Sequence, residues 1–369
     1  MNDTFPHQPK DRLQQSKQLA QFRILDANSN RALEGLRVVE EFVRFTLDDS
    51  HLSLLCKQLR HRLTDRLTAI DKQFRFAARD TRNDVGTQIS TKSEQIRSGV
   101  LDVANASLQR LKEALRCLEE YSKTFDTELA QDFEVIRYEV YTLERAINNT
   151  WNSCERLKDA RLYVLMDGCQ NRDSFQNLAT CLISGEVDVV QFRDKSLSDR
   201  ELLERASLLR QLTANTQTLF IMNDRPDLAV LSRADGVHLG QEELTVKDAR
   251  QIVGIDALIG ISTHSIQQAR EAVLDGANYI GCGPTFPSET KTFAGFPGIS
   301  FLSEVKNEIQ LPAFAIGGIN PTNLEQVINA GMSRVAVSQA VTAVTSPNKA
   351  IQIFQEHLGS ACRPSTTVD

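Results

Sequence analysis

The sequence lacks any segment suited to a membrane or to secretion. No run approaches the roughly 20 consecutive apolar residues that a membrane-spanning helix needs. Residues 1–15 are polar and contain no apolar signal core. These absences predict a cytoplasmic protein without a membrane partner.

Patterned cysteine and excess positive charge are also missing. The seven Cys are scattered without Cys-x-x-Cys pairs or zinc-like spacing, and their odd number favours reduced thiols over a disulfide framework. The net charge of -6 and the pI near 5.7 do not favour nucleic-acid binding, which depends on a basic surface. Any anion must therefore be bound by a local group of cations.

The chain is long for one domain, and its pattern changes once along its 369 residues. Residues 1–17 are polar and Gln-rich, which predicts a disordered N-terminus. Residues 18–152 carry apolar side chains at three- and four-residue steps, as amphipathic helices do. Residues 153–369 instead alternate short apolar runs with helical stretches. We therefore expect an all-α domain followed by an α/β domain.

The helical part contains an internal duplication. Residues 30–42 are similar to residues 109–121, and residues 59–63 are similar to residues 136–140. This predicts two related hairpins packed as a bundle of about four long helices, with a loop at 76–87 between them. The matched charges could line a polar cleft or form solvated stripes on a duplicated scaffold, and the sequence leaves both possibilities open.

The second part contains eight candidate strands separated by helical stretches. Eight such alternations within about 200 residues favour a (β/α)8 barrel, whose functional residues gather at the carboxyl ends of its strands. A doubly wound open sheet is the competing fold, but no Gly-x-Gly-x-x-Gly follows the first strand. The candidate strands are 161–166, 187–192, 218–222, 236–239, 257–261, 278–282, 313–316 and 334–337.

Polar or glycine residues follow seven of these strands, in phase with the strand ends. Random surface loops rarely have this arrangement, so the strand ends are predicted to form a site. The residues in question are Gln191, Arg193, Lys195, Asn223, Asp224, His238, Glu243, Ser262, His264, Gly317, Gly318 and Ser338, together with the long loop 281–291.

The charges at the strand ends point to a diphosphate. Arg193, Lys195 and Lys291 are three cations that would face a common centre and neutralise much of its charge. Asp224 and Glu243 fit best as ligands of Mg2+, which prefers oxygen ligands and shares them with phosphates. The alternative for each carboxylate is an N-cap or a salt bridge, and capping is common where a helix follows, as it does after Asp224.

A second phosphate site is predicted at the last two strands. Gly317 and Gly318 precede one helix and Ser338 precedes the next, as expected for a phosphate site after strands seven and eight of a barrel. The loop after strand six, with Ser288 and Thr290, is a candidate lid. Two phosphate sites imply two phosphorylated substrates, and diphosphate with Mg2+ suggests that diphosphate is the leaving group.

Taken together, these motifs resemble those of thiamine-phosphate synthases over residues 160–355. The resemblance implies transfer of the hydroxymethylpyrimidine group from its diphosphate to the nitrogen of a thiazole phosphate, or of its carboxylated form. Thiamine phosphate and diphosphate would be the products. The motifs are QFRDK (191–195), ND (223–224), DGVHLGQE (235–242), GISTH (260–264), GPTFPSETK (283–291), IGGI (316–319) and VAVSQA (335–340).

The resemblance also implies roles for individual residues. The pyrimidine diphosphate would be bound by Gln191, Phe192, Arg193, Asp194, Lys195, Asn223, Ser262 and Lys291. The thiazole phosphate would be bound by Ser288, Glu289, Thr290, Gly318, Val337 and Ser338. Mg2+ would be held by Asp224 and Glu243. The candidate catalytic residues are Arg193, Lys195, Ser262 and Lys291.

Two positions depart from the pattern of that family. Glu243 stands where Asp is usual, which keeps the charge but lengthens the side chain by one methylene. Ser288 stands where Thr is common and keeps the hydroxyl. A thiazole tautomerase, an isomerase on a similar barrel, is the competing activity. It would need proton-transfer groups rather than a set of residues for metal and diphosphate.

The helical part looks like an extension fused to this synthase in some bacteria. The similar stretches are 26–42, 77–87 and 108–121. That domain family has been linked to phosphorylation of the pyrimidine phosphate, but the sequence has neither a P-loop nor a Gly-rich kinase loop. Formation of a homo-oligomer and hand-over of substrate are alternative roles.

Overall fold

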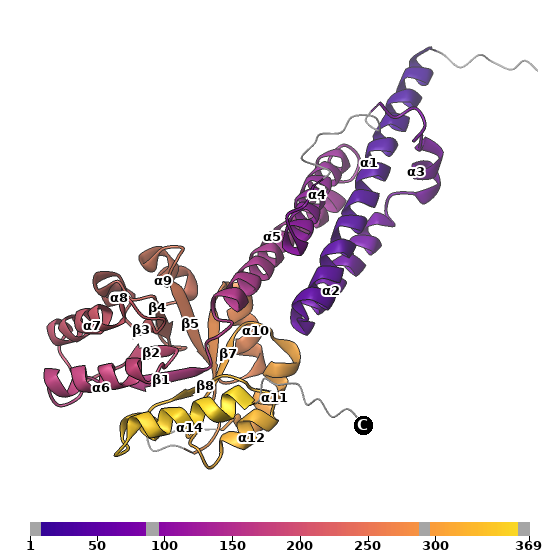
Figure 1. Ribbon diagram of the computed structural model, residues 1–369. Helices are drawn as coiled ribbons and strands as arrows, with labels where there is room; N and C mark the ends of the chain where they lie inside the picture. Colours follow the sequence, from indigo (N-terminus) through magenta and orange to yellow (C-terminus); the bar gives the residue numbers. More distant parts are fainter. Residues whose placement is uncertain (1–8, 86–95, 288–295, 361–369) are drawn as a thin grey trace, which may run out of the picture. The chain divides into compact units, whose positions relative to one another are not determined.

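The computed structural model describes residues 9–85, 96–287 and 296–360 (Figure 1). The chain divides into two compact units, Met1–Asn148 and Asn149–Asp369, close to the predicted boundary between residues 152 and 153. Within the described residues, no helix is both long and apolar enough to cross a membrane.

The first unit is helical, and four of its helices are long, as predicted. Helix α1 already begins at Pro9, so residues 9–17, which we expected to be disordered, are helical. The expected loop at 76–87 also begins later, because residues 76–78 belong to a short helix. The elements are α1 (Pro9–Phe42), the π-helix η1 (Val43–Leu47), α2 (Ser50–Leu67), α3 (Lys72–Ala78), α4 (Val100–Ser122) and α5 (Thr127–Arg156).

The duplication is visible in the capping of the second helix of each hairpin. Asp49 Oδ1 accepts a hydrogen bond of 2.7 Å from the backbone N–H of Leu52 at the start of α2. Asp126 Oδ1 accepts the equivalent bond of 3.0 Å from Leu129 in α5. An N-cap carboxylate satisfies a backbone donor that the helix itself leaves unpaired. The two hairpins are therefore built in the same way.

Equivalent positions of the two hairpins also form the core of the bundle. Helices α1 and α4 pack closely at Gly35, where a Cβ atom would lie only 2.9 Å from the carbonyl oxygen of Ser107. The buried pairs of equivalent residues are Leu36 and Leu115, Val39 and Leu118, Leu52 and Leu129, Leu59 and Ile136, and Leu63 and Val140.

The second unit is a closed barrel of eight parallel strands, which confirms the predicted (β/α)8 fold. The open sheet is ruled out because β8 pairs with β1, with Leu162 opposite Val335. The strands are β1 (Leu162–Met166), β2 (Val189–Phe192), β3 (Leu219–Asn223), β4 (Gly236–Leu239), β5 (Leu258–Thr263), β6 (Tyr279–Cys282), β7 (Ala313–Ile316) and β8 (Val335–Val337).

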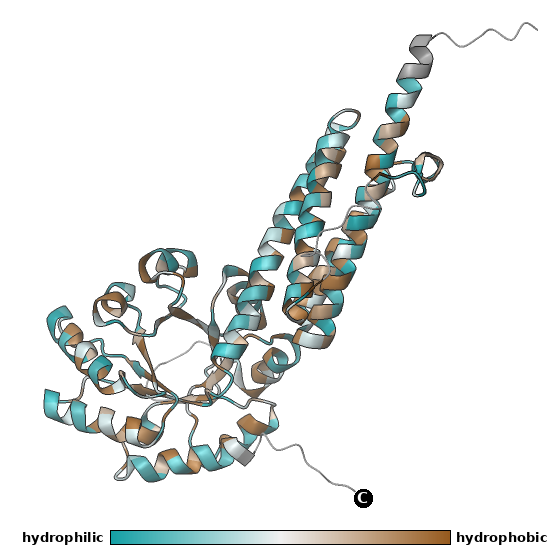
Figure 2. Ribbon diagram, turned by 45° about the horizontal axis from the view of Figure 1, so that its top comes forward, coloured by the Kyte–Doolittle hydropathy of each residue, from teal (hydrophilic) through white to brown (hydrophobic). Residues whose placement is uncertain are grey.

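Helices surround the strands on the outside of the barrel (Figure 1). Figure 2 shows hydrophobic colouring on the strands and mixed hydrophobic and hydrophilic colouring on these helices, as expected when one face of each helix covers a parallel sheet. The helices are α6 (Arg172–Ser184), α7 (Asp199–Thr213), α8 (Pro226–Ser232), α9 (Val246–Val253), α10 (Ile266–Asp275), α11 (Gly298–Glu308), α12 (Leu324–Asn329), α13 (Gln339–Thr342) and α14 (Pro347–Ser360).

The barrel interior is filled by large side chains set against glycines. Tyr163, Tyr279 and Phe314 pack against one another, with the rings of Tyr163 and Phe314 5.2 Å apart between centroids. The ring of Tyr279 occupies the space where Gly260 would otherwise carry a Cβ atom. Glycine at this position of β5 is therefore a packing requirement of the interior.

We expect Gly260→Ala to destabilise the barrel, because the added methyl group would overlap the buried ring of Tyr279. Overpacking of this kind costs about 1–3 kcal/mol. Gly359→Ala in α14 is the control, since a Cβ atom there meets nothing within 4 Å. Urea unfolding of both variants measures the difference, and equal stabilities would contradict this view of the interior.

Candidate active site

A chain of hydrogen-bonded side chains crosses the barrel interior toward the carboxyl ends of its strands. Gln191 Nε2 donates to the Tyr163 hydroxyl at 2.7 Å, and that hydroxyl lies 3.1 Å from the Tyr279 hydroxyl. The Tyr279 hydroxyl lies 3.3 Å from His238 Nδ1, and His238 Nε2 lies 3.0 Å from Ser262 Oγ. The chain thus fixes Gln191 and Ser262, two predicted substrate-binding residues.

One acceptor in this chain has no partner. Gln191 is 2 % exposed, and its Oε1 atom makes no hydrogen bond to any residue that the structure describes. A buried carbonyl oxygen without a donor costs about 1–3 kcal/mol, so such an atom calls for a specific partner.

The imidazole of His238 is held in its neutral form. Burial lowers the pKa of His238 to about 4, and the nearby charge of Asp224 only partly opposes this effect. At neutral pH the ring is therefore uncharged, and it can donate from one nitrogen and accept at the other. It lies in the chain as a positioning group for Ser262.

A cation and a carboxylate meet at the ends of β2 and β3. Lys195 Nζ lies 3.6 Å from Asp224 Oδ2, and the Lys195 side chain is 62 % exposed. Arg193, half-buried, is fixed through its backbone N–H, which donates to the Met166 carbonyl oxygen at 2.9 Å. The strand register places Arg193 level with Asn223, since Gln191 pairs with Ile221.

The alternative role of Asp224 as an N-cap is wrong. Helix α8 has Arg225 as its N-cap residue, without a side-chain capping bond. Asp224 has a left-handed backbone conformation with φ of 57°, and its N–H donates to the His238 carbonyl oxygen at 2.8 Å. Its carboxylate thus stays at the rim of the barrel, available to a ligand.

The second predicted metal ligand, Glu243, is exposed on the loop after β4, the strand next to β3. Among the described residues, no group of three or more His, Cys, Asp or Glu side chains is placed to hold a metal ion. Asp224 and Glu243 could therefore hold one only together with oxygens of a ligand.

Two residues predicted with the QFRDK motif serve the scaffold. Phe192 is fully buried and points to the helical layer, where its ring contacts that of Phe175 at 5.2 Å between centroids. Asp194 accepts from the N–H groups of Ser196 and Gly168 at 2.7 and 2.9 Å. These bonds lower the pKa of Asp194 despite its partial burial. Asp194 thus links the loops after β1 and β2.

The predicted phosphate site lies at neighbouring strands. Ile316 of β7 pairs with Ala336 of β8, so Gly318 and Ser338, each two residues further on, come level. Gly318 has φ of 65°, and a Cβ atom there would lie 2.7 Å from the Pro287 carbonyl oxygen. Only glycine fits this close approach of two loops at a positive φ.

Of the remaining predicted residues, two are described by the structure and four are not. Val337 is buried as the last residue of β8. His264 Nδ1 lies 2.5 Å from the Gly283 carbonyl oxygen and so supports the start of the loop after β6. Ser288, Glu289, Thr290 and Lys291 lie outside the described residues.

Sequence reasoning missed the tyrosines of the hydrogen-bonded chain. Tyr163 and Tyr279 were counted only as apolar strand residues. The available signal was the alternation of side chains along a strand, because residues two positions apart point to the same face of the sheet. With it, Tyr163 could have been placed on the inner face of β1.

Comparison with known proteins identifies the family of each part of the chain. A family model described as thiamine monophosphate synthase matches residues 162–341, and one described as the ThiD2 family matches residues 23–146. A thiamine-phosphate synthase of Rhodopirellula baltica is 47% identical over 86% of this chain and 88% of its own length. That of Gloeobacter violaceus is 42% identical over 91% and 96%.

A solved structure gives the same result for the barrel. Thiamine phosphate pyrophosphorylase from Pyrococcus furiosus is 31% identical, with a TM-score of 0.50, and the match covers 57% of this chain and 100% of that one. The chain belongs to the thiamine-phosphate synthase family, with a ThiD2 domain at its N-terminus, and is an enzyme with thiamine-phosphate synthase activity in thiamine biosynthesis.

Proposed function

We propose that the enzyme joins hydroxymethylpyrimidine diphosphate to a thiazole phosphate, or to its carboxylated form, by loss of diphosphate before bond formation. The observation that carries this proposal is the buried, unpartnered Oε1 of Gln191, which Tyr163 holds at one end of the hydrogen-bonded chain that ends at Ser262. An amino group on a pyrimidine ring is a donor of the kind that this acceptor lacks.

The pyrimidine would bind over the hydrogen-bonded chain, with Gln191 and Ser262 as its polar contacts. Its diphosphate would then extend toward Arg193, Lys195 and Asn223 at the rim. Lys291, from the loop after β6, is proposed as the third cation. Asp194 would act through the loop that it holds, since both of its carboxylate oxygens already accept hydrogen bonds.

Mg2+ fits the carboxylate of Asp224, which the fold keeps out of helix capping and beside a cation. Together with Glu243 and the diphosphate oxygens, Asp224 would hold the ion, which supplies positive charge to the leaving group. Lys195 would lie between this carboxylate and the diphosphate.

The thiazole phosphate would bind where the loops after β7 and β8 come level, at Gly318, Val337 and Ser338. The left-handed turn at Gly318 frees its backbone for close approach to a phosphate. Ser288, Glu289 and Thr290 are proposed to complete this site from the neighbouring loop.

In the reaction, the bond between the pyrimidine methylene carbon and the diphosphate oxygen breaks, and diphosphate leaves with the electron pair. The lone pair of the thiazole nitrogen then forms the new carbon–nitrogen bond. A charged imidazole would repel the intermediate methylene cation, so the neutral state of His238 favours this path. A tautomerase would need a pair of proton-transfer groups. In the hydrogen-bonded chain, Gln191 does not titrate and His238 instead positions Ser262.

The helical unit has two proposed roles. One is catalytic, the phosphorylation of the pyrimidine monophosphate. The other is non-catalytic, either formation of a homo-oligomer or hand-over of substrate. A cytoplasmic location also remains a prediction from the sequence.

Diphosphate release is the test of the proposed reaction. Release should require hydroxymethylpyrimidine diphosphate, a thiazole phosphate and Mg2+ together, and it should match thiamine phosphate formed one to one. Release at the full rate without the thiazole phosphate would show a hydrolase and contradict the proposal.

Asp224→Asn should raise the Mg2+ concentration needed for half-maximal rate at least about tenfold, because an amide is a weaker ligand than a carboxylate. Asp227→Asn is the matched control three residues away, where the carboxylate pairs with Arg225 at 2.7 Å. An unchanged Mg2+ requirement in Asp224→Asn would exclude the proposed ligand.

His238→Leu should lower kcat/KM for the pyrimidine diphosphate about 5- to 150-fold, because Ser262 and Tyr279 each lose a buried hydrogen-bond partner. His238→Gln should retain most of the rate, since its amide can reach Ser262. Because the pKa of His238 is about 4, neither variant should shift the pH–rate profile between pH 6 and 8. A shifted profile would mean that His238 transfers protons.

A further inference from the structure

The duplicated hairpins contain the same ionic network twice, with one difference in charge. We call the network of Arg37, Glu40, Glu41, Arg44, Lys57 and Arg60 the first network. We call that of Arg116, Glu119, Glu120, Lys123, Glu134 and Arg137 the second network. Equivalent members are named in the same order, as the sequence repeat aligns them.

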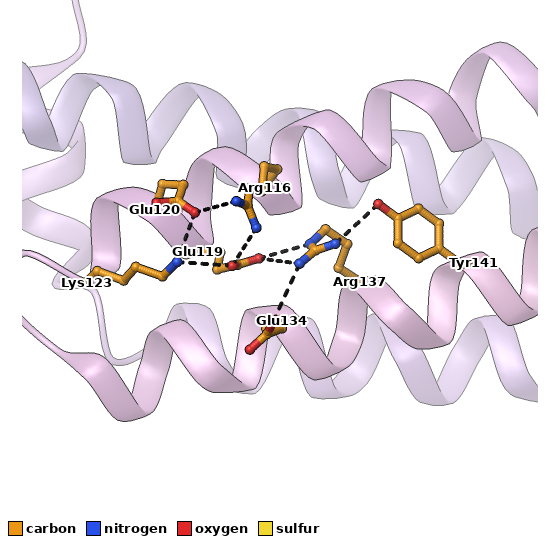
Figure 3. A network of polar contacts seen from close by, with 7 residues as sticks. All are labelled: Arg116, Glu119, Glu120, Lys123, Glu134, Arg137 and Tyr141. Atoms are coloured by element: carbon orange, nitrogen blue, oxygen red, sulfur yellow. Dashed lines mark hydrogen bonds and ion pairs between the residues drawn. The ribbon is translucent and has the colours of Figure 1, made fainter.

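The second network is electrically balanced (Figure 3). The buried Glu119 accepts from Arg137 at 2.9 Å and from Arg116 at 2.8 Å. Lys123 pairs with Glu119 and with Glu120, and Glu134 stands 3.9 Å from Arg137. Three cations thus face three carboxylates, and each cation has at least one partner.

The first network repeats the buried centre of the second. Glu40 is 4 % exposed and accepts from Arg60 Nε at 2.8 Å, with Arg37 Nη1 at 3.5 Å. At the position of Glu134, however, the first network has Lys57. Four cations therefore face two carboxylates, an excess of two positive charges.

Two of these cations have no carboxylate partner among the described residues. Lys57 is exposed and forms no ion pair within the described part of the chain, and Arg44 lies over the ring of Phe45 at 4.8 Å from its centroid. Lys123, the equivalent of Arg44, pairs with two glutamates. The second hairpin thus neutralises its cations with its own carboxylates, whereas the first hairpin leaves Arg44 and Lys57 available to bind an anion.

These cations line a cleft of about 700 Å³, a volume typical of small-molecule sites. The exposed ring of Phe45 and the side chain of Leu54 add an apolar part. The hydroxyls of Ser50 and Ser53 lie at the start of α2, where the helix dipole favours anions. The lining comprises Arg37, Glu40, Arg44, Phe45, Asp48, Asp49, Ser50, Ser53, Leu54, Lys57 and Arg60.

The lining contains three carboxylates. Glu40 is held by two arginines, and Asp49 caps α2 through the Leu52 N–H. Asp48, the third, is exposed in a left-handed conformation with φ of 56°. With Arg37, Arg44, Lys57 and Arg60 opposite them, the lining retains a net charge of +1.

The backbone beside the cleft differs between the hairpins as well. Residues 43–48 of the first hairpin correspond to residues 122–125 of the second, so the first has two residues more. They are accommodated by the π-helix η1, which carries both Arg44 and Phe45. Such π-helical segments are often found at functional sites.

We propose that this cleft binds a small phosphorylated aromatic compound. Arg44, Lys57 and Arg60 would bind the phosphate, and Phe45 would contact the ring. The second hairpin would be the balanced, non-binding copy. This site is separate from the barrel site and does not depend on the reaction proposed there.

Calorimetric titration of the full chain with phenyl phosphate tests the proposal. Lys57→Glu restores the charge found at the equivalent position of the second hairpin, and it should weaken binding at this site at least about tenfold. Lys247→Glu on the exposed face of α9 makes the same change of net charge elsewhere and should bind as the unaltered chain does. Equal binding by both variants would overturn the proposal.

Phe45→Leu separates the two parts of the site. It should weaken binding of phenyl phosphate but leave binding of inorganic phosphate unchanged. Thiamine-phosphate formation by each variant reports on the barrel and should stay at the unaltered rate. Should Lys57→Glu fail to fold, Lys57→Gln takes its place, and undiminished binding by that variant would equally contradict the proposal.

Discussion

The candidate active site depends on one chain of hydrogen bonds inside the barrel, from Gln191 through Tyr163, Tyr279 and His238 to Ser262. These side chains come from five strands, and only the closed barrel brings them together. Since buried polar groups are costly unless paired, the chain restricts the orientation of both of its ends. Gln191 Oε1 has no hydrogen-bond partner among the described residues, and we propose that a donor of the substrate binds it.

The same constraint explains the small residues of the interior. The ring of Tyr279 lies over Gly260, and a Cβ atom at Gly281 would already contact His238 Cε1 at 3.4 Å. Larger side chains would displace the hydroxyl that joins Tyr163 to His238. Packing and polarity in this barrel are therefore set by the same few positions.

The helical unit shows how a duplicated scaffold can diverge in charge and in one turn while its core is kept. Both hairpins keep the N-cap aspartate, the buried glutamate and its arginine. They differ at Lys57 and Glu134, and in the turn that η1 occupies. Such a change leaves the core untouched, because the altered side chains lie outside it.

Much of this could be predicted from the sequence. Strand periodicity and the change of rhythm near residue 153 gave the barrel, and the repeat gave the paired hairpins. Residues 9–17 were misjudged because their polar composition hides a helix that continues from the bundle. Asp224 could not be resolved between capping and ligation, since that depends on whether the strand ends in a left-handed turn.

The chain of Tyr163, Tyr279 and His238 was out of reach for a different reason. Its contacts join residues 116 and 41 positions apart, and their distances follow from barrel closure rather than from local pattern. The excess charge of the first network was equally hidden, because it depends on Lys57, a position at which the two copies of the repeat differ.

A crystal structure with hydroxymethylpyrimidine diphosphate or an unreactive analogue bound tests the central claim most directly. We expect the pyrimidine amino group within hydrogen-bond distance of Gln191 Oε1, with Ser262 still bonded to His238. A ring bound elsewhere, with Gln191 Oε1 unpaired, would contradict the account.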